Sequence, residues 1–209
     1  MNFYIADMHL GHENVIPFDN RPFRSVNEMN RALIDNWNRK VGKDDDVYII
    51  GDFSYRSETD PAWYLEQLKG KKHLIQGNHD GELLKNSKAM EYLVSVDKML
   101  FVKDGRERIV LCHFPVAEWN GFRHGAWHIY GHIHGWRSKT AEFMDAQGKA
   151  LNAGCMLNGY EPVTFKELVK NHKKKRDMLI MLRYLVSGFV PLKMMEVQIY
   201  VQKQEFIWT

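Results

Sequence analysis

Short apolar runs that each end at a cluster of polar residues are the feature of this sequence that most restricts its fold. Runs of this length are typical of buried strands, and here they alternate with stretches whose apolar residues recur at helical spacing. A chain with this alternation is expected to form a layered α/β fold. The expected core strands cover residues 3–5, 47–50, 73–75, 109–112 and 128–130.

Capping residues predict three helices around these strands. Residues 25–28 and 164–167 have the spacing of a capping box, in which a hydroxyl residue and a glutamate satisfy each other's backbone N–H groups. Asp60 followed by Pro61 predicts a further helix over residues 61–68, because proline fits the first turn of a helix.

The chain is expected to divide at about residue 170. Its 209 residues suit one compact domain over residues 1–170, followed by a C-terminal extension, residues 171–209, of uncertain structure. In the extension, residues 178–185 favour a short helix and residues 197–201 a strand. The basic run 173–176 is typical of a solvated helix end, with nucleic-acid contact as the alternative.

The composition excludes several classes of protein. An apolar content of 44% and a charged content of 26% are ordinary for a globular domain, and a net charge of +3 does not by itself indicate nucleic-acid binding. Cys112 and Cys155 make no disulfide framework, which favours two buried thiols and a reducing compartment. No signal peptide or membrane span is expected, so the predicted location is cytoplasmic and no membrane partner is expected.

Five polar clusters follow the expected strands. The carboxyl ends of strands in an α/β sheet share one edge, so these clusters are expected to form one site. Residues two apart in an extended segment project to the same side, as paired ligands must. A lone histidine at a strand end is usually a hydrogen-bonded core or surface residue, but that explanation does not cover the whole set. The clusters are Asp7 with His9, Gly51 with Asp52, Gly77 to Asp80, His113, and His132 with His134.

The mixture of imidazole and carboxylate groups indicates a metal site. These ligands suit zinc, iron or manganese, whereas magnesium and calcium sites are usually built from oxygen donors. The clusters hold more candidate ligands than one tetrahedral ion needs. Two divalent ions would use them all, and such a pair can hold both the attacking and the leaving oxygen of a displacement.

The same clusters carry a resemblance to a known family. Asp-x-His, Gly-Asp, Gly-Asn-His-Asp, a later His and Gly-His-x-His occur here in order, from Asp7 to His134. In this the sequence resembles the calcineurin-like metallophosphoesterase superfamily, and its small bacterial and phage members in particular, over residues up to about Pro162. The resemblance implies the metallophosphoesterase fold, a β-sheet sandwich flanked by helices.

The resemblance also implies a role for each matching residue. His79 falls where the family has the histidine that contacts the substrate phosphate and assists the leaving group. Asp80 is grouped with His79 at the catalytic centre, where we expect it to orient its neighbours. The implied metal ligands are Asp7, His9 and His134 for one ion, Asn78, His113 and His132 for the other, and Asp52 as the bridge.

The activity implied by the resemblance is hydrolysis of a phosphodiester or phosphomonoester, possibly of a nucleotide, by attack of a metal-bridging hydroxide. Manganese is the expected metal, with iron, zinc and nickel as alternatives. A catalytically silent interaction module and a nuclease acting on polynucleotides are the alternative functions. Tyr55 stands where the phosphoprotein-phosphatase branch has a second aspartate, which favours the phosphodiesterase-like branch.

Several basic residues are candidates for contact with a substrate phosphate. A planar guanidinium suits phosphate, although a solvated surface arginine is an equal alternative. Residues 119–127 combine aromatic and basic side chains, which can stack a nucleobase, but simple packing of Trp119 and Trp127 is favoured. The candidate substrate-binding residues are His12, Arg21, Arg24, Arg56 and Arg123.

Overall fold

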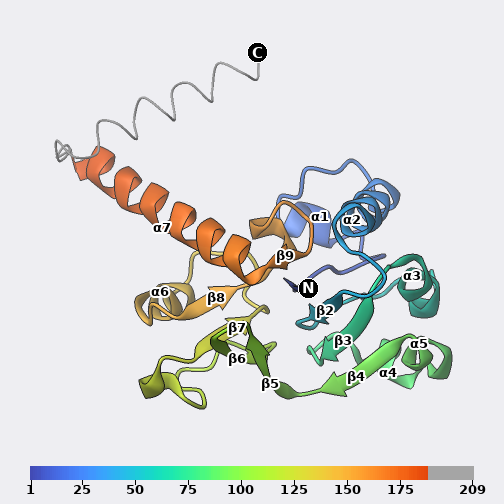
Figure 1. The fold of residues 1–209 in the computed structure, drawn as a ribbon. Coiled ribbons are helices and arrows are strands. Elements are labelled where there is room, and N and C mark those ends of the chain that lie inside the picture. The colour runs from blue at the N-terminus through green and yellow to red at the C-terminus, as the bar shows by residue number, and fades with distance from the viewer. Residues whose placement is uncertain (188–209) are drawn as a thin grey trace. The chain divides into compact units, whose positions relative to one another are not determined.

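The computed structural model describes residues 1–187, and in these residues nine strands form two sheets (Figure 1). The chain divides into two compact units, Met1–Val169 and Lys170–Thr209, and the first unit holds both sheets. One sheet has the order β4-β3-β2-β1-β9 and the other the order β5-β6-β7-β8. The strands are β1 (Asn2–Ile5), β2 (Asp46–Ile49), β3 (Lys71–Ile75), β4 (Leu93–Asp97), β5 (Met99–Asp104), β6 (Glu107–Cys112), β7 (Trp127–Tyr130), β8 (Ala150–Asn152) and β9 (Val163–Thr164).

Parallel pairing dominates both sheets. β1 to β4 are parallel with β9 antiparallel at one edge, and β6 to β8 are parallel with β5 antiparallel at the other sheet's edge. Parallel neighbours need crossover connections, and helices supply them in the first sheet. The carboxyl ends of β1, β2 and β3 therefore lie along one edge. The crossover helices are α2 (Val26–Lys40), α3 (Pro61–Gln67), α4 (Gly81–Lys85) and α5 (Ser87–Glu91).

The two faces of β1 bury different side chains. Phe3 and Ile5 pack with residues of α2 and α3, whereas Tyr4 and Ala6 pack with the apolar side chains of β6, β7 and β8. Alternation along the strand thus creates one core between helices and sheet and a second core between the sheets. Figure 1 shows α2, α3 and α5 on the same side of the five-stranded sheet.

A third, smaller core covers the outer face of the four-stranded sheet. It contains Val110 and Tyr130 from the sheet, Trp119 from the loop after β6 and Met144 from α6. The resulting order of layers is helices, sheet, sheet, and then α6 with its neighbouring loop. The remaining helical segments are α1 (Val15–Phe18), α6 (Lys139–Ala146), α7 (Phe165–Ser187) and two short 3₁₀ helices, Phe122–His124 and Cys155–Leu157.

This architecture confirms the α/β sandwich flanked by helices that the sequence predicts. The five expected core strands are β1, β2, β3, β6 and β7. Asp60 caps α3 by accepting a hydrogen bond from the backbone N–H of Ala62. Glu167 accepts hydrogen bonds from the N–H and the hydroxyl of Thr164, and its own N–H lies 3.4 Å from Thr164 Oγ1.

Residues 178–185 are helical, as expected, but they belong to the long helix α7 and do not form a short helix. α7 runs without a break from Phe165 to Ser187, because no proline or glycine interrupts this segment before Gly188. The strand expected at residues 197–201 lies outside the described residues. Strands β4, β5, β8 and β9 were not among the expected core strands.

Two further expectations concern the cysteines and the membrane. Cys112 and Cys155 are buried free thiols, as predicted. Within residues 1–187, no helix combines the length and the apolar character that crossing a bilayer requires.

Trp37 provides a test of the core between α2 and the five-stranded sheet. It is fully buried, and its indole N–H donates to the carbonyl of Lys69 at 2.9 Å. Replacement by alanine is expected to lower the free energy of unfolding by about 3–5 kcal/mol through cavity formation. Chemical denaturation of Trp37→Ala and of the half-exposed Trp63→Ala measures this difference. Equal loss in both variants would contradict the assignment of Trp37 to the core.

Candidate metal centre

The loops after five strands meet at one edge of the sandwich. Asp7 and its neighbours follow β1, Asp52 follows β2, Asn78 follows β3, and the second sheet contributes His113 after β6 and the loop after β7. Backbone hydrogen bonds join the loops directly, from Asp7 N to the Gly51 carbonyl and from Gly131 N to the His113 carbonyl. The side chains that the sequence placed in separate clusters are thus brought together.

The backbone of these loops is left-handed at most of the candidate ligands. Residues 1–187 contain eight non-glycine residues with positive φ, and five of them are candidate ligands: Asp7, His9, Asp52, His132 and His134. Each such conformation costs about 1–3 kcal/mol and persists only where the surroundings enforce it. The expectation that Asp7 and His9 converge through an extended segment was wrong, because β1 ends at Ile5 and their side chains converge through these turns.

Glycines allow the loops to approach closely. Gly51 has a φ of +77°, and a Cβ atom there would overlap the imidazole of His113. A Cβ atom on Gly77 would overlap the Asp52 carboxylate. Both positions therefore need glycine for space, and Gly51 needs it for its backbone conformation as well.

One group of candidate ligands consists of Asp7, His9 and His134. Their ligand atoms lie within 4.8 Å of one another. The Nε2 atoms of His9 and His134 are 3.3 Å apart, and His9 Nε2 lies 3.6 Å from Asp52 Oδ2. Two imidazole nitrogens and two carboxylates therefore face one small volume.

A second group adjoins the first through Asp52. The ligand atoms of Asp7, Asp52 and His113 also lie within 4.8 Å of one another, so Asp7 belongs to both groups. His113 Nε2 lies 3.5 Å from Asp52 Oδ2. The amide oxygen of Asn78 lies 3.0 Å from His113 Nε2 and 2.9 Å from His132 Nδ1. Asp52 Oδ2 is therefore situated between the two groups.

The chemistry of these residues fits divalent cations. Asp7 Oδ2 is buried without a hydrogen-bond partner, which is costly for a carboxylate unless a cation compensates it. Burial raises the pKa of Asp7 to about 6 and lowers the pKa of His9 to about 2. His9 is thus held as the neutral imidazole, which is the form that binds metal ions.

Hydrogen bonds outside the ligand set orient two of the imidazoles. His113 Nδ1 lies 2.9 Å from the Ile50 carbonyl, and His134 Nδ1 lies 2.8 Å from both carboxylate oxygens of Asp19. Donation from Nδ1 in each case leaves the lone pair of Nε2 directed at the site. Burial acts to lower the pKa of His134, but the Asp19 hydrogen bond and the charges of Asp7 and Asp19 outweigh it and raise this pKa.

Arg21 holds Asp19 and the loop after β1. Its guanidinium donates to Asp19 Oδ2 and to the carbonyls of Asp7 and Met8, each at 2.9 Å. The side chain has no exposed surface. Arg21 therefore lies behind the candidate ligands and does not line the cavity over them, which does not favour the substrate contact expected from the sequence. Asp19 was missed because it belongs to none of the five clusters.

Asp80 also forms hydrogen bonds with backbone groups behind the candidate ligands. Its carboxylate accepts hydrogen bonds from the N–H groups of Asp52, Phe53 and Gly77, at 3.0, 2.9 and 2.7 Å. It therefore ties the loop after β2 to the loop after β3. The sequence groups Asp80 with His79 at the catalytic centre, and we assign Asp80 a positioning role there.

A cavity of about 490 Å³ opens over the candidate ligands. His79, Tyr55, Arg56 and His12 contribute to its wall together with the ligand side chains. The rings of His79 and Tyr55 are in contact, with centroids 4.0 Å apart. Two of the proposed substrate-binding residues, His12 and Arg56, are therefore at the cavity.

The other two candidate arginines lie outside this cavity wall. Arg24 is exposed, and Arg123 forms an exposed ion pair with Glu118 at 3.3 Å. The neighbouring aromatic residues pack against the protein, as the favoured interpretation predicts. Trp119 is buried and donates to the Ala126 carbonyl, and Trp127 donates to Glu107.

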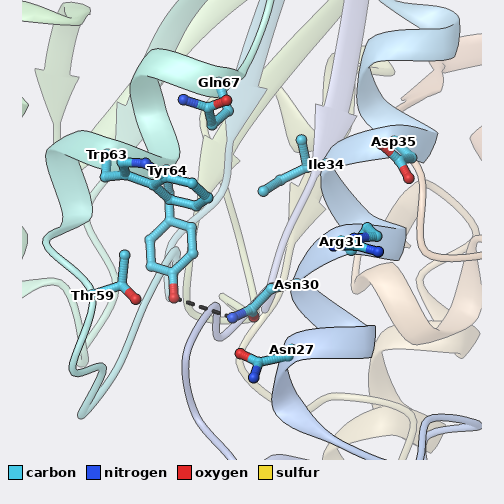
Figure 2. A pocket seen from close by; sticks show the side chains of 9 residues that line it. All are labelled: Asn27, Asn30, Arg31, Ile34, Asp35, Thr59, Trp63, Tyr64 and Gln67. Atoms are coloured by element: carbon cyan, nitrogen blue, oxygen red, sulfur yellow. Dashed lines mark hydrogen bonds between the residues drawn. The ribbon is translucent and has the colours of Figure 1, made fainter.

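A second cavity of about 490 Å³ lies between α2 and α3 and contains none of the candidate ligands (Figure 2). Asn30 Nδ2 donates to the Tyr64 hydroxyl there at 3.1 Å. Asn30 Oδ1 accepts from Gly11 N, and the Tyr64 hydroxyl lies 3.1 Å from Ser57 Oγ. This network anchors the loops that carry His12, Tyr55 and Arg56 to the helices.

Comparison with known proteins agrees with this geometry. The family model described as calcineurin-like phosphoesterase matches residues 3–136, and the chain belongs to this family. It is 31% identical over 172 residues to an uncharacterized protein of Methanocaldococcus jannaschii, covering 80% of this chain and 89% of that one. It is 29% identical over 160 residues to the gene 66 protein of Mycobacterium phage L5, covering 63% and 76% of the two chains.

A solved structure supports the fold. The crystal structure of a protein of unknown function from Aquifex aeolicus superposes with a TM-score of 0.65 and 25% sequence identity. The match covers 81% of this chain and 98% of that one. The two-sheet architecture with flanking helices is thus shared with a related protein.

Asp19 provides a test of the metal centre. Asp19→Asn removes the charge that orients and polarises His134, and the expected result is a roughly 10- to 100-fold weaker affinity for a divalent ion. Titration calorimetry with Mn²⁺ measures the affinity, with the exposed Asp35→Asn as the control. Unchanged affinity in Asp19→Asn, in a variant that remains folded by circular dichroism, would show that the charge of Asp19 does not support metal binding through His134.

Proposed function

We propose that this protein is an active phosphoesterase that uses two divalent ions to hydrolyse a phosphodiester or a small phosphomonoester. The observation that carries the proposal is the position of Asp52 Oδ2, 3.6 Å from His9 Nε2 and 3.5 Å from His113 Nε2. A carboxylate oxygen between two groups of ligands is the arrangement that a bridging ligand requires. The proposed ligands are Asp7, His9, Asp52, Asn78, His113, His132 and His134.

When bound, a pair of divalent ions lowers the pKa of water and neutralises charge on a phosphate. The mixed nitrogen and oxygen donors favour manganese, with iron, zinc or nickel as alternatives. The rest of the chemistry falls to side chains in the cavity wall. Arg56 and His12 are positioned there to contact the oxygens of a phosphate.

His79 is the proposed catalytic residue. Its backbone N–H donates to Asp52 Oδ1 at 2.9 Å, which fixes its main chain beside the proposed bridging carboxylate. Its ring lies between Tyr55 and His9, with centroid distances of 4.0 and 5.5 Å. An imidazole in this position can stabilise the developing charge or give a proton to the leaving oxygen.

Two properties of the site support an enzyme over a silent interaction module. A module needs the fold but has no need of His79 in a cavity beside a complete ligand set. Residues with strained backbones also cluster at these ligands, and strain of this kind is typical of functional sites. A metal-dependent turnover measurement distinguishes the two functions directly.

Substitution of His79 tests the catalytic assignment. His79→Ala is expected to reduce kcat by roughly 10²- to 10⁴-fold, because a proton donor is lost, while the content of bound metal stays unchanged. Hydrolysis of bis(p-nitrophenyl) phosphate with Mn²⁺ and elemental analysis give the two readouts. The exposed His124→Ala is the matched control. Loss of metal together with activity would instead place His79 among the ligands.

Substitution of Asp52 tests the bridging assignment. Asp52→Asn keeps the shape of the side chain and removes its negative charge, so both metal content and turnover are expected to fall together. Metal analysis after dialysis against the ion measures this, with Asp35→Asn as the control. An Asp52→Asn protein that retains two ions and normal turnover would refute the assignment.

A further inference from the structure

Two exposed aromatic rings stand at one end of the cavity over the metal ligands. Phe18 at the end of α1 is 56% exposed, and Trp136 after β7 is 49% exposed. Their ring centroids lie 4.4 Å apart with an interplanar angle of 47°, and both residues line the cavity. We call Phe18 and Trp136 the aromatic rim.

The aromatic rim contacts His134, a ligand of the proposed metal centre. The ring of Phe18 lies edge-on to the imidazole of His134, with centroids 5.9 Å apart, and Trp136 lies 6.4 Å from the same imidazole. His134 in turn lies 5.0 Å from His9. A group held on the rim is therefore adjacent to a phosphate held at the ligands.

The opposite end of this series of ring contacts is polar. From His9 the contacts continue to His79 and then to Tyr55, whose ring lies 5.1 Å from the guanidinium carbon of Arg56. The ligands therefore separate an end that carries a cation from an end that carries exposed aromatic faces. A substrate that satisfies both ends has a phosphate and a flat apolar group close together.

We propose that the aromatic rim binds a nucleobase, so that the substrate is a phosphate ester of a nucleoside. This inference rests on the proposed function. A nucleobase can stack on any aromatic side chain that has an exposed ring face, and such stacking tolerates different bases. An acyl chain would need a long apolar groove, whereas the rim offers two half-exposed rings. Asn14 and Ser138, which line the same cavity, can bond the edge of a base.

Turnover of paired substrates tests the rim. The variants Phe18→Ala and Trp136→Ala are compared on AMP against glycerol 3-phosphate, and on a dinucleoside monophosphate against glycerophosphoethanolamine. Loss of stacking is expected to lower kcat/KM roughly tenfold for the nucleoside esters and to leave the aliphatic esters within about twofold. Trp136→Phe keeps a ring and is expected to restore most of the activity.

Matched controls come from aromatic residues of similar exposure away from the cavity. Phe143 is 48% exposed on α6, and Trp63 is 47% exposed beside the second cavity. Phe143→Ala and Trp63→Ala are expected to leave all four substrates unaffected. An equal loss for nucleoside and aliphatic esters in the rim variants would overturn the proposal and leave the proposed function intact.

A binding measurement keeps the inference testable if the protein turns over none of these substrates. A non-hydrolysable phosphonate analogue of AMP is titrated into metal-loaded protein, and Kd is measured by calorimetry. Trp136→Ala is expected to raise Kd roughly tenfold, while Trp63→Ala does not change it. If Trp136→Ala binds the analogue more weakly and the wild-type protein turns over no substrate, only the proposed function is overturned. Equal Kd values for Trp136→Ala and the wild type would sink the nucleobase subsite.

Discussion

A single carboxylate oxygen, Asp52 Oδ2, lies within 3.6 Å of imidazole nitrogens from both sheets of the sandwich. Removing carboxylates and imidazoles from water in so small a volume is costly unless cations compensate for it. Burial has already moved the pKa of Asp7 to about 6 and that of His9 to about 2. The surrounding backbone must therefore hold these groups together before an ion binds.

Charged side chains that do not line the cavity hold these groups in place. Asp80 accepts hydrogen bonds from three backbone N–H groups of the loops after β2 and β3, and Arg21 donates to two carbonyls and to Asp19 after β1. These bonds stabilise left-handed turns that would otherwise be unfavourable. Asp19 extends the same support to His134. Charged residues that resemble catalytic candidates by type thus support the candidate ligands structurally.

Some aromatic residues pack inside the protein and others remain exposed, and the composition does not show which. Trp119 and Trp127 make hydrogen bonds within the protein and complete its cores. Phe18 and Trp136 have similar side chains and lie far apart in the sequence, yet they meet at the wall of the cavity with their rings exposed. Which aromatic faces remain open depends on what covers them, and this is a property of the assembled layers.

The sequence by itself determined the core strands, the helix caps and the polar clusters that follow the strands, because each depends on spacing within a few residues. β1 and α3 are examples, as are the paired histidines of the loop after β7. Only the tertiary structure decided that Asp7 belongs to both groups of candidate ligands, that Arg21 faces inward, and that the aromatic rim stands beside His134. The first and the last of these facts depend on contacts between loops more than 100 residues apart, such as Asp7 with His132, which form only when the two sheets pack face to face. The orientation of Arg21 depends on how the loop after β1 folds back on Asp7, Met8 and Asp19.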